Sequence, residues 1–155
     1  MAEERNIFIS HIHEDDEHVG KLKELLADQG VIVRNGSVTT DKFNDAQNEE
    51  YIKREILAPR IEWSSVLVVL VSEDTKDSPY VNWEIEYADR ADKRIVVVYE
   101  HGEAGVELPK AATDYADAVV AWDGASIVDA INGENIWQDP NGNPRPLQQL
   151  KRHNC

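Results

Sequence analysis

Residues Ser64–Ser72 have the sequence SSVLVVLVS, the most hydrophobic run in the chain. Continuous aliphatic and β-branched content over this length is typical of a strand buried on both faces, as the central strand of a parallel sheet is. A second run of this kind, RIVVVY, occupies Arg94–Tyr99. Between the two runs, Ser78 followed by Pro79 predicts a helix N-cap and a first helical residue. A helix therefore connects two buried strands.

The same alternation of strand and helix continues in both directions along the chain. The sequence predicts strands at Asn6–Ser10, Val31–Arg34 and Asp117–Trp122, and helices from Asp15 or Asp16 to Gln29, at Glu49–Ile61 (kinked or ended by Pro59) and at Gly124–Ile131. A polar stretch at 35–48 is expected to be a long loop, and such loops are usually functional. This order predicts an α/β fold: a flavodoxin-like, doubly wound parallel sheet of about five strands.

Length and composition set the domain organisation. With 155 residues, 41% of them hydrophobic, the chain can form one domain with a buried core. We expect residues 1–131 to form this domain and residues 132–155, rich in Asn, Gly and Pro, to be a C-terminal extension packed on it or trailing from it. The single Cys155 cannot form an internal disulfide.

The charge pattern excludes several classes of partner. A net charge of −14 argues against general binding to nucleic acid or anionic lipid, which requires Lys and Arg contacts to phosphate. No apolar run approaches the roughly 20 residues of a membrane-spanning helix, and the opening MAEERN does not resemble an export signal. We therefore expect a cytoplasmic protein that does not contact membranes.

Glu84 interrupts the apolar side of the helix predicted after the central strand. At about 100° per residue, one side carries Tyr80, Val81, Glu84, Ile85, Tyr87, Ala88 and Ala91, and the other carries Asn82, Glu86, Asp89 and Arg90. A carboxylate in a low-dielectric position is neutralised, paired or used in chemistry, because burying an isolated charge is costly. The alternative to a chemical role is a purely structural one, in which Glu84 lies at the edge of the core and pairs with an Arg from a neighbouring element.

The expected position of Glu84 favours a chemical role. Ligands of doubly wound sheets bind beyond the carboxyl ends of the strands, and helical side chains lean toward the helix N-terminus, which here faces that edge. A carboxylate there can stabilise an oxocarbenium-like centre, attack it, or hydrogen-bond to ribose hydroxyls. Trp83, next to Glu84 and outside the apolar arc, could border such a site.

Other kinds of site are disfavoured. The segment HIHEDDEH places His11, His13 and Asp15 near the H-x-H-x-D-H spacing of metallo-hydrolases, but Asp16 stands where the final His is needed. We therefore expect no metal site and attribute the acids to capping of the next helix. The strand ends at Ser10 and Ser72 lack the acids of a phosphoacceptor receiver domain. The chain also contains no G-x-G-x-x-G or Walker motif.

Three segments together resemble a TIR domain, and specifically the TIR-like subunit of bacterial Thoeris anti-phage defence systems. They are NIFISHIHEDD, NEEYIKREILAPRIEWSSVLVVLVSEDT and SPYVNWEIEYA, the last similar to the S-x-W-V-x-W-E-I-E pattern of that family. The resemblance covers roughly residues 6–99. Three residues depart from it: Tyr80 stands where Trp is frequent, and His11 and Ile12 replace the aromatic and basic residues common in animal-type relatives.

The resemblance implies an NAD+ glycohydrolase or ADP-ribosyl cyclase in which Glu84 is catalytic. Ser10, His11 and Trp83 would line the substrate pocket, and the 35–48 loop with Asp45 would shape it. Because the chain is acidic, Arg34 or Lys42 and helix N-termini would have to hold the pyrophosphate. NAD+ is then a substrate, and no resident cofactor is expected.

The product implied is ADP-ribose, a cyclic isomer or a conjugate, acting as a diffusible nucleotide on a downstream effector. A homo-oligomer is possible. Two alternatives stay open from the sequence. One is a non-catalytic TIR interaction module that signals by self-assembly. The other is an enzyme like the nucleoside deoxyribosyltransferases, which share a related fold and also use a Glu at an anomeric carbon.

Overall fold

The computed structural model describes residues 3–12, 16–35, 57–73, 75–100 and 107–139. Several predicted features lie outside these ranges. They are the 36–48 part of the polar loop, including Asp45 and Lys42, most of the helix expected from Glu49, and the chain beyond residue 139.

Five parallel strands form one sheet in the order β2-β1-β3-β4-β5. The strands are β1 (Glu3–Ser10), β2 (Val31–Asn35), β3 (Val66–Val71), β4 (Arg94–Tyr99) and β5 (Ala118–Val120). Strand β3 lies at the centre, and all six of its residues are buried. This order is that of the flavodoxin-like fold, so the predicted fold class is confirmed.

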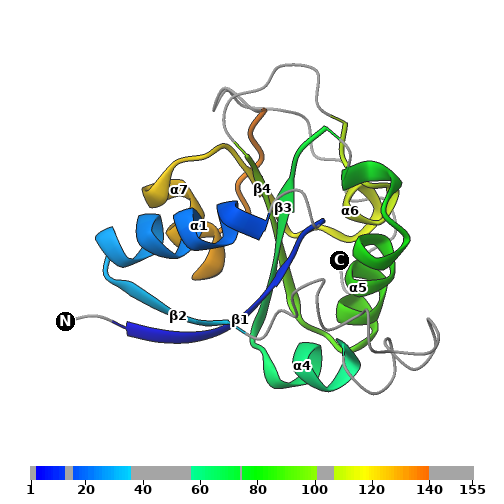
Figure 1. The fold of residues 1–155 in the computed structure, drawn as a ribbon, viewed down its shortest axis with the longest axis horizontal. Coiled ribbons are helices and arrows are strands. Elements are labelled where there is room, and N and C mark those ends of the chain that lie inside the picture. Colours follow the sequence, from blue (N-terminus) through cyan, green and yellow to red (C-terminus); the bar gives the residue numbers. More distant parts are fainter. Residues whose placement is uncertain (1–2, 13–15, 36–56, 74, 101–106, 140–155) are drawn as a thin grey trace.

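Helices cover both faces of the sheet (Figure 1). They are α1 (Asp16–Asp28), α4 (Ala58–Trp63), α5 (Pro79–Arg90), α6 (Lys110–Tyr115) and α7 (Gly124–Ile131), with a short 3-10 helix, η3 (Thr75–Asp77). In Figure 1, α1 and α7 lie on one side of the strands and α5 and α6 on the other, with α4 at the amino ends of the strands. Each face can therefore bury the side chains that point toward it.

Side chains of the strands alternate between two hydrophobic cores. Phe8, Leu67 and Val97 pack on the side of α5, whereas Ile9, Val68 and Val98 pack on the side of α1 and α7. Successive strand residues point to opposite faces, so every second residue shares a core. The even-numbered residues of β1 therefore face α5, and Ser10, the last residue of β1, belongs to this set.

The β5 edge of the sheet is not open. The backbone N–H of Val119 donates to the carbonyl oxygen of Ile136, and the N–H of Gln138 donates to the carbonyl oxygen of Val119, each at 2.8 Å. The segment Ile136–Gln138 thus runs parallel to β5 as a short additional pairing. Residues 136–138 therefore cover part of the β5 edge. The predicted division of the chain at residue 131 stays a prediction.

Some element boundaries differ from those predicted. β1 begins at Glu3 rather than Asn6, because its polar first residues pair with β2. Helix α4 begins at Ala58 and continues to Trp63, with Pro59 in its first turn, where the missing N–H costs little. The helix expected from Glu49 lies mostly outside the described residues, so the predicted effect of Pro59 on it stays a prediction. Helix α6 was missed, since six residues carry too little periodicity to detect. By contrast, β4 and α7 match their predicted bounds.

Candidate active site

The structure brings Ser10 and Glu84 together at the carboxyl end of β1. The Ser10 hydroxyl donates a hydrogen bond to Glu84 Oε1 at 2.5 Å. Ser10 is 1% exposed and Glu84 is 5% exposed. Two residues separated by 74 positions therefore form a buried polar pair at the strand edge where ligands of this fold bind.

The local sequence explains how Glu84 reaches this place. Helix α5 starts at Pro79, and its N-cap Ser78 accepts a hydrogen bond from the Val81 N–H at 3.2 Å, as predicted. Val81, Ile85 and Ala88 bury one side of the helix against the sheet. Glu84 lies within this buried side, one turn after Tyr80.

Asp89 is also buried, although the helical wheel placed it on the opposite side of α5. Helix α5 packs against α4 and α6 as well as against the sheet. Its covered arc is therefore wider than that of a helix on a sheet alone.

Burial controls the protonation of Glu84. Removal from water raises the pKa of Glu84 to about 8, and the hydrogen bond from Ser10 lowers it by a smaller amount. Among the described residues no Lys, Arg or His is paired with this carboxyl group. The structural alternative, an ion pair between Glu84 and an Arg, is therefore absent from that part of the chain. Without a ligand, Glu84 is therefore mostly neutral at pH 7.

Two other predicted site residues lie close to this pair along the chain. His11 follows Ser10 directly, is partly buried, and has its Nδ1 3.0 Å from the carbonyl oxygen of Ile9. Trp83 precedes Glu84 and stacks on Tyr87, with ring centroids 5.1 Å apart and an interplanar angle of 28°. Trp83 and Tyr87 are both partly buried and pack against the hydrophobic core on the α5 side of the sheet. Roles for His11 and Trp83 in substrate binding stay predictions.

Arg34 is not brought to the Ser10–Glu84 pair. It lies in β2 level with Asn6, four residues before the end of β1, which is about 13 Å along the strands. Its guanidinium group instead lies over the Trp63 ring, 5.8 Å from the ring centroid. Asp45, the remaining predicted binding residue, is outside the described residues.

A second polar pair lies at the same edge of the sheet, on the side of α1. His18 Nδ1, in the first turn of α1, is 2.9 Å from Oε1 of Glu100, which directly follows β4. Both side chains are mostly buried. From the sequence, His18 was noted only as the last residue of the segment HIHEDDEH, and Glu100 was not singled out. The signal that could have identified Glu100 is its position, because it is a polar residue directly after a buried strand. No group of three His, Cys, Asp or Glu in the described residues could hold a metal ion.

The comparison with protein families decides what this fold and site belong to. Residues 8–105 match the family described as the TIR-like domain of Thoeris protein ThsB. The chain belongs to this family. The matched segment contains both Ser10 and Glu84. None of the curated proteins compared with the chain matches it.

Two solved structures show limited similarity to this TIR-like domain. The CMP N-glycosidase BcmB of Clostridium botulinum is 18% identical, with a TM-score of 0.39 over 60% of this chain and 70% of that one. A conserved protein from Enterococcus faecalis V583 is 14% identical, with a TM-score of 0.42 over 90% and 92% of the two chains. Both TM-scores are too low for either structure to bear on the activity.

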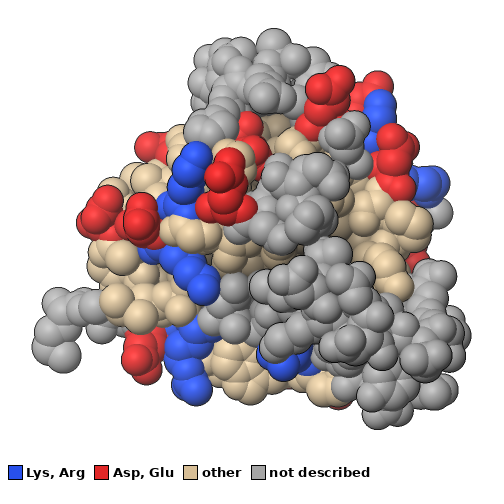
Figure 2. All heavy atoms as spheres, viewed as in Figure 1, with Lys and Arg blue, Asp and Glu red and all other residues tan. Residues whose placement is uncertain are grey.

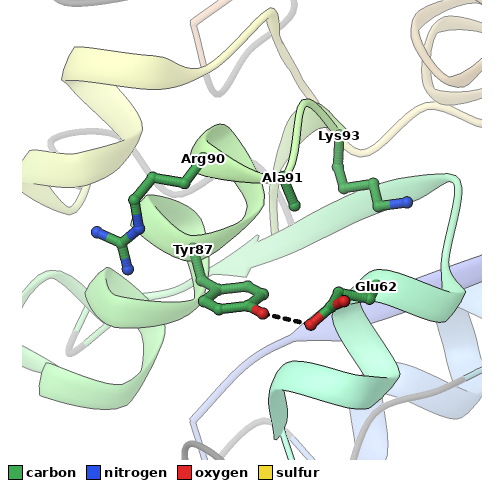
Figure 3. A pocket seen from close by; sticks show the side chains of 5 residues that line it. All are labelled: Glu62, Tyr87, Arg90, Ala91 and Lys93. Carbon is green, nitrogen blue, oxygen red and sulfur yellow. Dashed lines mark hydrogen bonds between the residues drawn. The ribbon is translucent and has the colours of Figure 1, made fainter.

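A cavity of about 430 Å³ lies away from Glu84, at the other end of α5 (Figure 3). Glu62, Tyr87, Arg90, Ala91 and Lys93 line it. The Tyr87 hydroxyl donates to Glu62 in Figure 3, and Arg90 lies over the Tyr87 ring. Because Lys93 immediately precedes β4, this cavity is near the amino ends of the strands. The candidate site around Glu84 lies instead at the carboxyl ends, where ligands of this fold bind.

The surface of the TIR-like domain is acidic in its described part. Figure 2 shows Asp and Glu side chains over α1 and along the upper right of the visible face, with Lys and Arg side chains between and below them. An anionic substrate thus gains no general attraction to this face and depends on local donors. None of the helices in the described ranges has the length and apolar character needed to cross a bilayer.

Proposed function

We propose that this TIR-like domain cleaves the bond between nicotinamide and ribose in NAD+, with Glu84 as the catalytic carboxylate. The observation that carries the proposal is the buried contact between Glu84 and Ser10 at the carboxyl end of β1. Membership of the Thoeris ThsB family supports the assignment. A buried carboxyl with a strongly raised pKa at a ligand-binding edge is the kind of group that enzymes use for chemistry.

The proposed reaction moves positive charge from nicotinamide to the ribose. When the C1′–N bond breaks, its electron pair goes to the ring nitrogen and the pyridinium becomes neutral nicotinamide. The ribose then carries an oxocarbenium-like charge at C1′ and O4′. The Glu84 carboxylate, held in place by the Ser10 hydroxyl, stabilises this charge.

An acceptor then completes the reaction at C1′. Capture by water gives ADP-ribose and releases a proton. Capture by an adenine or ribose atom of the same molecule gives a cyclic nucleotide. We propose that the product diffuses to a separate effector and serves anti-phage defence, in keeping with the Thoeris family.

The test is nicotinamide release from NAD+ by the purified protein, together with mass spectrometry of nucleotides from cells making it during phage challenge. Glu84→Gln should abolish release and remove any new nucleotide. Glu86→Gln is the matched control, because Glu86 is exposed on the same helix. This variant should release nicotinamide at the wild-type rate. Continued turnover by Glu84→Gln would refute the assignment. A lack of NAD+ consumption in every condition would instead favour a role in self-assembly.

A further inference from the structure

Glu84 is a carboxyl group that the described part of the protein leaves without a positive partner. It is 5% exposed, and the Ser10 hydroxyl at 2.5 Å is its hydrogen-bond donor. A hydroxyl stabilises a carboxylate less than a cation does, and a buried carboxylate without a cation is costly. Such a group keeps its proton until a cation arrives.

The charged residues around α5 are engaged elsewhere. Helix α5 packs against α4, α6, β3, β4 and η3, and it contacts β1 through the Ser10–Glu84 hydrogen bond. Strand β3 contains no charged residue, and the charged residues of β1, Glu3, Glu4 and Arg5, lie at its opposite end from Ser10. The charged residues of the other elements are Arg60 and Glu62 on α4, Lys110 and Asp114 on α6, Arg94 on β4, and Lys76 and Asp77 on η3. Lys110 pairs with Asp114, Lys76 with Glu107, and Arg94 donates to Ala130 O. None of these residues is paired with Glu84.

We propose, as an extension of the proposed function, that the substrate itself supplies this missing cation. The Glu84 site thereby selects N-glycosides whose leaving group is positively charged, and Glu84 gives up its proton to solvent when they bind. A pyridinium nucleotide such as NAD+ meets this requirement. NADH does not, because its dihydronicotinamide ring is neutral. CMP does not, because its base is neutral.

This charge linkage makes binding depend on pH in a defined direction. The free protein must lose a proton from a group with a pKa of about 8 before it can bind the cation as a carboxylate. The apparent Kd for NAD+ should therefore fall about 50-fold between pH 6 and pH 8. The Kd for NADH should change less than about threefold, because its binding does not need the carboxylate.

The experiment measures the binding of NAD+ and NADH to the whole protein at pH 6, 7 and 8 by calorimetry. If NAD+ is cleaved during the measurement, kcat/KM for NAD+ replaces its Kd, since kcat/KM reports the titration of the free enzyme. NADH is then measured as a competitive inhibitor. Any pH dependence that does not come from Glu84 persists when Glu84 is replaced by Gln, so that variant separates the two contributions.

Two variants isolate the contribution of Glu84. Glu84→Gln keeps an acceptor for the Ser10 hydroxyl but has no titrating proton. NAD+ binding should become independent of pH, and the preference for NAD+ over NADH at pH 8 should disappear. Glu86→Gln should keep the roughly 50-fold dependence of the wild type.

The outcomes separate this inference from the proposed function. Tight NAD+ binding with the expected pH dependence but no nicotinamide release would refute the proposed function and leave the charge selection intact. Glu84-dependent cleavage with a flat kcat/KM from pH 6 to pH 8 would overturn the charge selection and leave the function intact. Equal pH dependence for NAD+ and NADH, cleavage of CMP, or no binding of NAD+ would each overturn it.

Discussion

Replacing Glu84 by Gln should stabilise the protein, and increasingly so as the pH rises. In the folded state Glu84 keeps its proton up to about pH 8, because burial raises its pKa to about 8. In the unfolded chain a Glu loses its proton near pH 4.3, its typical value. Between these two values the folded state binds more protons, so the free energy of unfolding of the wild type falls as pH rises.

The size of the effect follows from the two pKa values. Each pH unit within this window costs up to about 1.4 kcal/mol, which gives roughly 3 to 4 kcal/mol between pH 5 and pH 8. Glutamine has no proton to lose, fits the same space, and can accept the Ser10 hydrogen bond. The stability advantage of Glu84→Gln over the wild type should therefore grow by roughly 3 to 4 kcal/mol from pH 5 to pH 8.

Thermal or urea unfolding at pH 5, 6, 7 and 8 measures this difference directly. For a chain of this length, a stability difference of roughly 3 to 4 kcal/mol corresponds to a Tm difference on the order of 10 °C. The exposed Glu86→Gln variant should follow the wild type at every pH. An advantage of Glu84→Gln that is the same at pH 5 and pH 8 would show that Glu84 is not buried in its neutral form.

Three further predictions concern neighbouring interactions. Ser10→Ala removes the donor that lowers the pKa of Glu84, so the pH at which stability stops falling should move upward in the same unfolding series; an unchanged profile would contradict the hydrogen bond. Ser78→Ala removes the N-cap of α5 and should cost about 1 kcal/mol in urea unfolding; a loss below a few tenths would show that the cap is dispensable. Hydrogen bonding to Glu62 raises the pKa of Tyr87, so Glu62→Gln should lower the pH of its phenol titration by ultraviolet absorbance; no shift would argue against this contact.

The sequence was sufficient for the features that depend on local pattern. The β-branched runs identified β3 and β4, and Ser78 with Pro79 fixed the start of α5. Helical periodicity then placed Glu84 on the buried side of α5. These features follow from residues close together in the chain, so one sequence contains them.

Features that depend on long-range pairing could not be obtained in this way. The contact of Glu84 with Ser10 requires β1 to lie next to β3, which only the strand order establishes. Arg34 was expected to help hold the pyrophosphate because the acidic chain offers few cations. The register of β2 against β1 places it level with Asn6 instead, well before the carboxyl end of β1. Strand register is set by packing, which the periodicity of one strand does not reveal.

The pairing of Ile136–Gln138 with β5 has a practical consequence for shorter versions of the protein. A fragment that stops at Ile131 would leave the peptide groups on the outer side of β5 exposed, and unprotected strands of this kind recruit other chains into aggregates. Fragments intended for crystallisation or binding work should therefore extend at least to Asp139.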